Sequence, residues 1–172
     1  TKKGLTVYNN YFNYDNFKGK EFENKYDLVL SNNAFAHIID IQNVIKGIKH
    51  TLKSEGDFIF EVHYLTNLLE EYQWDNIYHE HIYYYSISAL NNFFTRYGMT
   101  VVDFEEIPIH AGSLRVTVKN TKIDTPPKIK DRLDMESHTI CSDNFLDNYN
   151  IKVLQHINIF KDKIKELSKK YN

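Results

Sequence analysis

The sequence predicts an α/β fold in which helices flank a sheet that contains parallel strands. Residues 26–30 and 57–62 are compact apolar segments of the kind found in strands that are buried on both faces. An amphipathic helix is predicted between them, and the order strand, helix, strand is typical of a right-handed crossover that joins two parallel neighbours. Residues 100–107 and 114–119 are two further strand-like segments.

The first half of the chain is expected to alternate short strands with one helix. Residues 5–8 indicate a first short strand. Asp40 can cap a helix that runs to about residue 52, because the apolar residues of this stretch recur at spacings of three and four and share one side. These residues are Ile41, Val44, Ile45, Ile48 and Leu52. The segment 54–56 (Ser-Glu-Gly) is expected to end this helix before the strand at 57–62 begins.

The second half is expected to begin with a short helix near residues 65–72, which leads into an aromatic, His-rich loop. Ser86 is placed to cap a helix over residues 87–97. Gly98 is placed to end that helix, because glycine readily adopts the left-handed backbone conformation that follows many helices. The two later strands follow.

A Thr-Pro-Pro sequence at residues 125–127 breaks the chain, because proline cannot donate to a ladder and the residue before it is held extended. We expect a domain edge there, with residues 1–120 in one domain and residues 121–172 at the start of another. From Asp143 onward, apolar residues recur at every third or fourth position, which predicts a long C-terminal helix.

Composition excludes several classes of protein. The 172 residues carry a net charge of −2, so the chain lacks the positive charge that general nucleic-acid binding requires. The single cysteine, Cys141, excludes an internal disulfide and a multi-thiolate zinc site, and is expected to be a buried or incidental thiol. No apolar run approaches the ~20 residues of a membrane span, and the first residues lack a signal-peptide core. We therefore expect a cytoplasmic protein with no membrane partner.

Five of the eight histidines lie where strands are predicted to end: His37, His63, His79, His81 and His110. In sheets of this kind, ligands bind outside the carboxyl ends of parallel strands. The side chains of His37, Tyr78, Glu80 and His81 are therefore expected to be able to meet at one end of the sheet, although they are far apart in the sequence.

The Tyr78-His79-Glu80-His81 group has the parts needed to remove a proton next to a carbonyl. An imidazole exchanges protons near neutral pH, a carboxylate can orient it, and a tyrosine hydroxyl can donate to a developing oxyanion. Two other interpretations remain open: an aromatic loop whose histidines are exposed or satisfied in a core, and a His-Glu-His metal site. The helical HExxH spacing of metalloproteases is absent, and we expect no metal.

Four segments of the chain occur in an order that resembles one enzyme family. They are 31–40 (SNNAFAHIID), 60–65 (FEVHYL), 75–86 (DNIYHEHIYYYS) and 109–116 (IHAGSLRV). The series closely resembles the S-adenosylmethionine-dependent C-methyltransferases that act on nucleotide-linked keto-deoxysugars. The resemblance extends over about residues 4–118, and the rest of the chain resembles the start of that family's C-terminal domain.

The resemblance implies a partial Rossmann-like class I methyltransferase sheet with a C-terminal helical extension. Residues 5–8, 26–30 and 57–62 would be its third, fourth and fifth strands, and the last two strands would close it as an antiparallel hairpin. The implied cofactor is S-adenosylmethionine, with Asn32 and Asn33 beside it.

The resemblance also implies the roles of the site residues. His81 is favoured as the base that removes the sugar proton, since its ordinary pKa lies nearer neutrality than that of Tyr78. Glu80 would orient or hydrogen-bond, and His37 would polarise the ketone or bind the sugar. The substrate-binding residues implied in this way are His37, Tyr78, His110, Ser113 and Arg115.

The chain also departs from this family. The glycine-rich cofactor loop, the acidic residue that holds the ribose and the N-terminal cysteine-rich zinc module are all absent, and Ala111 stands where the family usually has glycine. We therefore expect a fragment whose partner is a missing N-terminal half, weak or inactive alone, with an apolar strand edge prone to self-association. The alternatives are a non-catalytic module that retains affinity for a nucleotide sugar, and a metal-dependent hydrolase.

Overall fold

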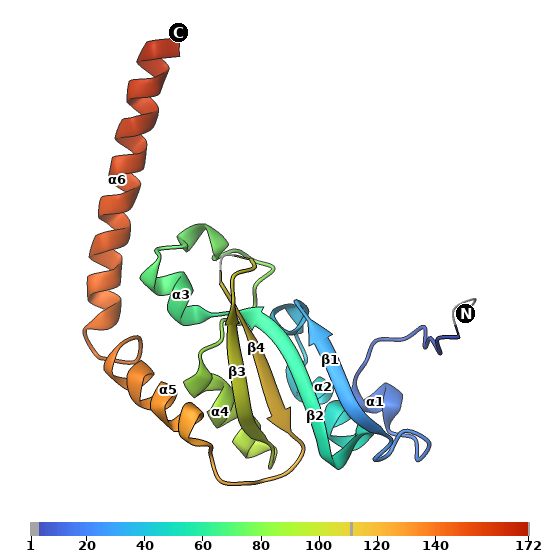
Figure 1. The fold of residues 1–172 in the computed structure, drawn as a ribbon. Helices are drawn as coiled ribbons and strands as arrows, with labels where there is room; N and C mark the ends of the chain where they lie inside the picture. The colour runs from blue at the N-terminus through green and yellow to red at the C-terminus, as the bar shows by residue number, and fades with distance from the viewer. Residues whose placement is uncertain (1–3, 111, 172) are drawn as a thin grey trace.

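A computed structural model describes residues 4–110 and 112–171. Its centre is a four-stranded sheet with the strand order β1-β2-β4-β3 (Figure 1). The strands are β1 (Tyr26–Asn32), β2 (Leu52–His63), β3 (Thr100–Ile107) and β4 (Ser113–Lys119). β1 is parallel to β2, whereas β4 is antiparallel to both of its neighbours. The predicted α/β class, the parallel pair and the antiparallel hairpin are thus confirmed.

The helices α2 (Ile41–Thr51) and α4 (Ile87–Arg96) begin directly after the predicted capping residues Asp40 and Ser86. The Asp40 carboxylate accepts a hydrogen bond from the Asn43 amide at 3.2 Å, and the Ser86 hydroxyl accepts one from the Ala89 amide at 3.1 Å. Gly98 has a φ of 67°, as expected for a residue that ends a helix. The helices are α1 (Tyr14–Phe17), α2 (Ile41–Thr51), α3 (Leu65–Glu70), α4 (Ile87–Arg96), α5 (Pro127–His138) and α6 (Phe145–Tyr171), with 3₁₀ turns η1 (Phe35–His37) and η2 (Trp74–Asn76).

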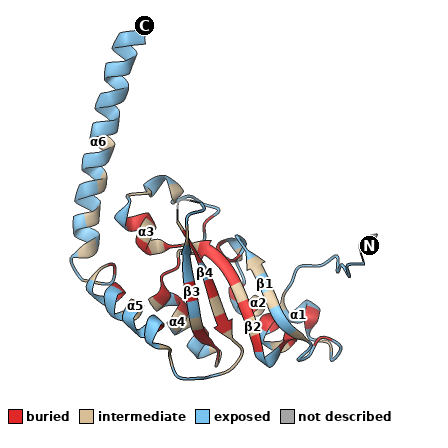
Figure 2. Ribbon diagram, in the orientation of Figure 1, coloured by how far each residue is buried: buried red, intermediate tan, exposed pale blue. Residues whose placement is uncertain are grey.

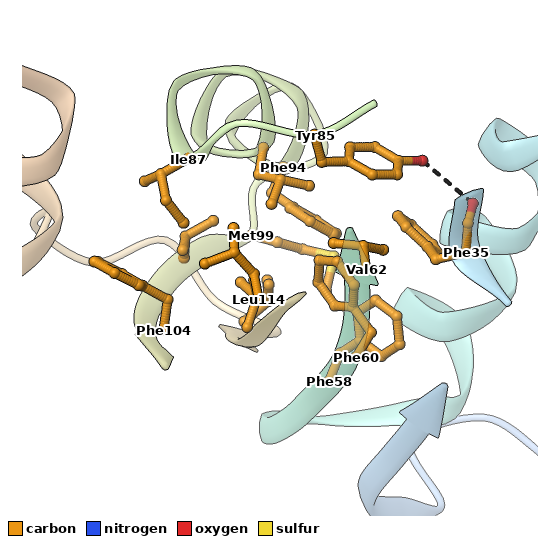
Figure 3. Close-up of a cluster of buried hydrophobic side chains, with 14 of the residues drawn as sticks. Phe35, Phe58, Phe60, Val62, Tyr85, Ile87, Phe94, Met99, Phe104 and Leu114 are labelled. Atoms are coloured by element: carbon orange, nitrogen blue, oxygen red, sulfur yellow. Dashed lines mark hydrogen bonds between the residues drawn. The ribbon is translucent and has the colours of Figure 1, made fainter. Parts of the chain in front are cut away.

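One face of the sheet carries the main hydrophobic core. The side chains of Phe58 and Phe60 on β2 pack with Phe35 and with Phe94 of α4, and all four are fully buried (Figure 3). Much of β2 is accordingly coloured as buried in Figure 2. The Tyr85 hydroxyl donates to the main-chain oxygen of Phe35 at 3.3 Å, which fixes the chain after the His-rich loop to the turn after β1. The core therefore holds Phe35 and Tyr85, which stand before His37 and after the His-rich loop in the sequence.

The opposite face of the sheet is not covered by a helix of the described chain; α2 and α4 both lie behind the sheet in Figure 1. Leu28 and Leu30 of β1 point to this open face and are 47% and 61% exposed. The prediction that β1 is buried on both faces is therefore wrong for this chain. Its apolar residues are buried only on the side where α2 supplies a partner, which leaves β1 as a partly exposed edge strand.

Two further details of the sheet differ from prediction. Residues 5–8 form no strand and take no part in the four-stranded ladder, so the predicted first strand is wrong. β2 begins at Leu52 and not at Asp57, because the chain is already extended directly after α2. The β1–β2 pairing steps from Tyr26↔Leu52 to Leu28↔Asp57, so the segment 54–56 forms an irregular bulge within the ladder.

The Pro-Pro sequence starts α5, in which Pro127 is the first residue. α5 packs against α4 and β3, and its Ile129 side chain is fully buried in the main core. The long predicted C-terminal helix is confirmed as α6, which extends away from the sheet in Figure 1. The division into two domains stays a prediction.

Candidate active site

Four histidines gather at the carboxyl ends of β1 and β2, although they come from four separate segments. The ring centre of His81 lies 5.1 Å from that of His37 and 5.1 Å from that of His63. The His63 ring centre lies 6.2 Å from that of His110. The structure therefore brings His37 and His81 together where the sequence analysis expected them, and it adds His63 at the centre of the group.

His81 has a defined hydrogen-bonding state. Its Nδ1 lies 3.0 Å from the main-chain oxygen of Asn76, and because a carbonyl can only accept, Nδ1 must carry a proton. In the neutral ring, Nε2 then has a free lone pair, and the Tyr78 hydroxyl lies 3.1 Å away and can donate to it. His81 is 9% exposed whereas Tyr78 is 42% exposed, so the tyrosine separates the imidazole from solvent.

His37 is oriented in a similar way, through the Glu80 main chain. Its Nδ1 donates to the Glu80 main-chain oxygen at 2.8 Å, so the neutral ring presents Nε2 as an acceptor. The Glu80 carboxylate itself lies on the surface, 3.9 Å from the ring of His79. The contact to His37 is therefore made by the Glu80 main-chain oxygen and not by its carboxylate, so the role expected of the Glu80 side chain stays a prediction. The Asn76 main-chain oxygen orients His81 in the same way.

The His-rich loop is docked to both neighbouring strand ends. The amides of Ile82 and Tyr83 both donate to the Ala36 oxygen, at 3.1 and 3.3 Å. The Leu65 amide donates to the Tyr85 oxygen at 2.9 Å, directly after β2. These bonds tie the loop to the turn after β1 and to the end of β2, so the His81–Tyr78 pair rests on rigid elements.

The turn between β3 and β4 contacts the same histidine group. His63 Nε2 donates to the His110 main-chain oxygen at 2.6 Å. Burial lowers the pKa of His63; the hydrogen bond to His110 opposes this shift, and the positive charges that His81, His110 and His37 can carry add to it. His110 itself has a φ of 49°, in the left-handed region, and Ala111 lies outside the described residues.

The other predicted binding residues lie on the open face of the sheet. The ladder places Asn32 opposite Glu61 and Glu61 opposite Arg115, while Ser113 lies opposite His63. Arg115 is an exposed residue whose guanidinium pairs with Glu105 at 3.0 Å. The predicted residues Asn32, Ser113 and Arg115 therefore lie on one face, beside the histidine group.

A largely apolar cavity of about 700 Å³ opens next to the end of β1. Tyr11, Phe12, Leu30, Ile38 and His37 are among the residues that line it. Asn33, at the end of β1, has a φ of 47°, a conformation that asparagine tolerates better than most residues. His37 therefore lines the cavity and also belongs to the histidine group.

Sequence reasoning assigned no role to two of these residues, His63 and Glu61. The sequence analysis names His63 only as one of five histidines near predicted strand ends. The alternation of β2 places positions 61 and 63 on the same face, and this pattern could have indicated a role for both residues.

Within residues 4–110 and 112–171, no three His, Cys, Asp or Glu side chains are grouped to hold a metal ion.

Similarity to known proteins identifies the family of this chain. A family model described as a methyltransferase domain matches residues 4–103, more than half of the chain. The chain belongs to the methyltransferase family. The chain is 42% identical over 89 residues to C-methyltransferase NovU of Streptomyces niveus, in a match that covers 52% of this chain and 21% of NovU.

Two solved structures are among those to which the chain was matched. A methyltransferase of Haloferax volcanii, solved with the Trm112 methyltransferase activator, has a TM-score of 0.48 at 19% identity and covers 61% of this chain and 59% of its own. The 1,6-didemethyltoxoflavin-N1-methyltransferase of Burkholderia thailandensis has a TM-score of 0.45 at 17% identity, with coverages of 58% and 46%. In the part of the chain that the structure describes, no helix is long and apolar enough to cross a bilayer.

Proposed function

We propose that this chain carries the substrate side of a C-methyltransferase that transfers a methyl group from S-adenosylmethionine to a carbon next to the keto group of a nucleotide-linked deoxysugar. The observation that carries the proposal is the Tyr78–His81 pair, in which a hydroxyl donates to a neutral imidazole whose far nitrogen is fixed by the Asn76 carbonyl. Such a pair can accept a proton from carbon. The similarity to NovU, which is a C-methyltransferase, supports the same reaction class.

The Tyr78–His81 pair would take the sugar proton. The proton leaves the carbon next to the ketone for the Tyr78 oxygen as the tyrosine proton moves to His81 Nε2, or it passes directly to Nε2 once the Tyr78 hydroxyl has turned away from that lone pair. In both cases the imidazolium that forms keeps its Nδ1–H bond to the Asn76 carbonyl, which stabilises its charge. The enolate carbon then forms the new bond to the methyl carbon as the carbon–sulfur bond breaks.

His37 would act on the oxygen side of the sugar. Because its Nδ1 donates to the Glu80 oxygen, neutral His37 accepts a hydrogen bond from a sugar hydroxyl at Nε2, and only the protonated ring donates to the ketone oxygen. His110 lies beside His63 and Arg115 lies opposite Glu61, and both would contact the rest of the nucleotide sugar. Ser113, opposite His63, is 2% exposed and its hydroxyl donates to the Ile109 oxygen at 3.1 Å; its role in sugar binding stays a prediction.

The cavity beside β1 fits the nucleoside part of S-adenosylmethionine. Its volume of about 700 Å³ lies in the usual range for ligand sites, and the Tyr11 and Phe12 rings offer apolar surfaces for a planar base. Asn32 and Asn33 lie at the adjoining strand end and would contact the cofactor. S-adenosylmethionine supplies an electrophilic methyl group, while these residues only hold and align it.

The test is methyl transfer to a keto-deoxysugar nucleotide, measured with this chain and an N-terminal half supplied in trans. We expect His81→Gln to lower kcat by about 10²–10⁴-fold, as for loss of a general base. The matched control is His79→Gln, whose side chain is 89% exposed, and it should retain activity. Absence of methyl transfer by the reconstituted wild-type protein would contradict the proposal.

A non-catalytic nucleotide-sugar-binding module is the second candidate, because His37 Nε2 can accept a hydrogen bond from a sugar hydroxyl without any proton transfer. This candidate requires that sugar binding survives without turnover, and that His81→Ala changes affinity only modestly. Titration of the same nucleotide sugar into the wild-type and His81→Ala chains, alongside the transfer assay, separates the two functions.

A further inference from the structure

His63 is a half-buried histidine at the end of β2 that the proposed mechanism does not use. Its ring lies in the middle of the histidine group, with its centre 5.1 Å from that of His81, the proposed base, and 6.2 Å from that of His110. His63 Nε2 donates to the His110 main-chain oxygen at 2.6 Å. Because Nε2 carries the proton of the neutral ring, Nδ1 keeps a lone pair and can only accept a hydrogen bond.

The surroundings of His63 favour the neutral ring. Burial lowers its pKa; the bond to the His110 oxygen opposes this shift, and positive charge on His81, His110 or His37 adds to it. At neutral pH the ring therefore presents an acceptor at Nδ1 and not a second N–H group.

The donors closest to the His63 ring are engaged elsewhere. The Ser113 hydroxyl, opposite His63 in the ladder, donates to a main-chain oxygen of its own turn at 3.1 Å. The N–H groups of neutral His81 and His37 donate to main-chain oxygens of the His-rich loop, at 3.0 and 2.8 Å. Within residues 4–110 and 112–171, no group donates to His63 Nδ1. This atom is also not one of the unpartnered side-chain atoms that are sealed in the interior, so a ligand can reach it.

The chemistry of Nδ1 decides which part of the substrate it can meet. A lone pair requires a donor, and at neutral pH neither the ketone nor the diphosphate of a nucleotide sugar offers one. The hydroxyl groups that a deoxysugar retains on its ring are donors. Since the ring centres of His63 and His81 are 5.1 Å apart, a sugar whose reacting carbon meets His81 brings its own ring beside His63.

We propose that His63 Nδ1 accepts a hydrogen bond from a hydroxyl of the sugar ring, and that His63 is thereby a specificity-determining residue of the methyl transfer. The inference rests on the proposed function and adds a residue to its sugar site. A site that hydrogen-bonds a substrate hydroxyl rejects the analogue that lacks it, because the acceptor is then left without a partner. The chain would select its sugar by a hydroxyl that takes no part in the reaction.

Two substitutions separate the roles of the two ring nitrogens. His63→Gln keeps an N–H group near the position of Nε2 for the His110 oxygen, and it has no acceptor at the position of Nδ1. His63→Asn places its amide oxygen near the position of Nδ1 and loses the bond to the His110 oxygen. The exposed residue His79 supplies the control variant, His79→Gln.

Calorimetric titration measures binding of a nucleoside-diphosphate-linked keto-deoxyhexose to each chain, with the N-terminal half in trans. His63→Gln should bind this sugar about 3- to 10-fold more weakly than wild type, the range for one hydrogen bond between neutral groups. His63→Asn should bind more tightly than His63→Gln, and His79→Gln should bind as wild type. Equal affinity of His63→Gln and wild type would overturn the inference.

Analogues of the sugar that each lack one ring hydroxyl identify the group that His63 meets. For one analogue, wild type and His63→Gln should bind equally, since the hydrogen bond is absent from both complexes. A difference between the two proteins that stays the same for every analogue would count against the contact.

Nitrogen-15 NMR of the wild-type imidazoles tests the same contact without a substitution at the site. The free chain should show His63 as the Nε2–H tautomer, and addition of the nucleotide sugar should move its Nδ1 resonance upfield as this atom accepts a hydrogen bond. Unchanged His63 resonances in a wild-type chain that binds the sugar overturn the inference and leave the proposed function intact. A wild-type chain that binds no nucleotide sugar, with or without the N-terminal half in trans, contradicts both.

Discussion

The Tyr64 hydroxyl donates a hydrogen bond to Oε1 of Glu136 at 2.9 Å, although 72 positions separate the two residues in the chain. The fully buried Glu136 carboxylate also accepts from the amides of Ile87 and Ser88, at 2.9 and 2.7 Å. Arg132 donates to the Tyr64 oxygen at 2.7 Å. Burial raises the pKa of Tyr64 to about 12, so this hydroxyl remains a donor at any ordinary pH. One side chain of α5 thereby joins the end of β2 to the start of α4.

Replacement of Glu136 should destabilise the chain strongly. Glu136→Ala leaves two amide donors and a tyrosine hydroxyl without their acceptor, and each buried donor left unsatisfied costs about 1–3 kcal/mol. Urea denaturation followed by circular dichroism measures the loss. Asp131→Ala, at an exposed position of α5, should change the free energy of unfolding by no more than about 0.5 kcal/mol. Similar effects for the two variants would contradict the assigned role of Glu136.

Stability should fall as the pH is lowered through the range in which His63 takes up a proton. The pKa of folded His63 lies below the ordinary value of 6.5, so the unfolded chain binds this proton at a higher pH than the folded chain does. The contribution of neutral His63 to the free energy of unfolding is therefore fully present above about pH 6.5, and it is lost as the pH falls through the lower pKa of the folded state.

The contribution of His63 can be isolated with a substitution that does not titrate. His63→Gln keeps a side-chain N–H group for the His110 oxygen but has no proton to gain. Free energies of unfolding measured from about pH 7.5 to 5 should fall less steeply for this variant than for wild type. Parallel curves for the two proteins would show that His63 is not responsible.

The start of α4 should depend on the Ser86 hydroxyl. Ser86→Ala removes the acceptor for the Ala89 amide and should lower the free energy of unfolding by about 1 kcal/mol, the usual value for an N-cap serine. Ser88→Ala is the control in the same turn, because the bond of Ser88 to Glu136 uses its main-chain amide and survives the change. Equal stability of the two variants would argue against the cap.

The open edge of β1 should cause self-association. Leu28 and Leu30 are exposed on a strand whose described pairing is with β2 alone. Sedimentation velocity of this chain should show mass rising with concentration, and the double change Leu28→Lys and Leu30→Lys should reduce the effect by charge repulsion. A wild-type chain that stays monomeric at all concentrations would rule out this surface as the cause.

The local parts of the fold could be predicted because their causes are local. Asp40, Ser86 and Gly98 mark helix ends through short-range hydrogen bonds and backbone conformation, and the structure has them in those roles. The strand prediction at residues 5–8 failed because a strand depends on a partner, and a four-residue apolar pattern does not specify one. The prediction that β1 is buried on both faces is wrong for the same reason, because burial of the second face also depends on a partner.

The site was predictable only as a set of residues that could meet. The sequence pattern brought His37, Tyr78 and His81 to one end of the sheet, but the carbonyl groups that fix the imidazole tautomers, those of Asn76 and Glu80, depend on main-chain geometry that no residue type reveals. Likewise, the position of Glu61 between Asn32 and Arg115 follows from the strand register, which the residue types alone do not specify.

The strand order has a consequence for the order of folding events. β4 lies between β2 and β3, so the central ladder joins Asp57 to Lys119 while the β3–β4 ladder closes over a short turn. Loop-closure entropy favours the hairpin first and the long-range ladder later. The His-rich loop belongs to the segment that this later step encloses. The geometry of the candidate site is therefore expected to be among the last features acquired as the chain folds, and to be the first lost when the β2–β4 ladder opens.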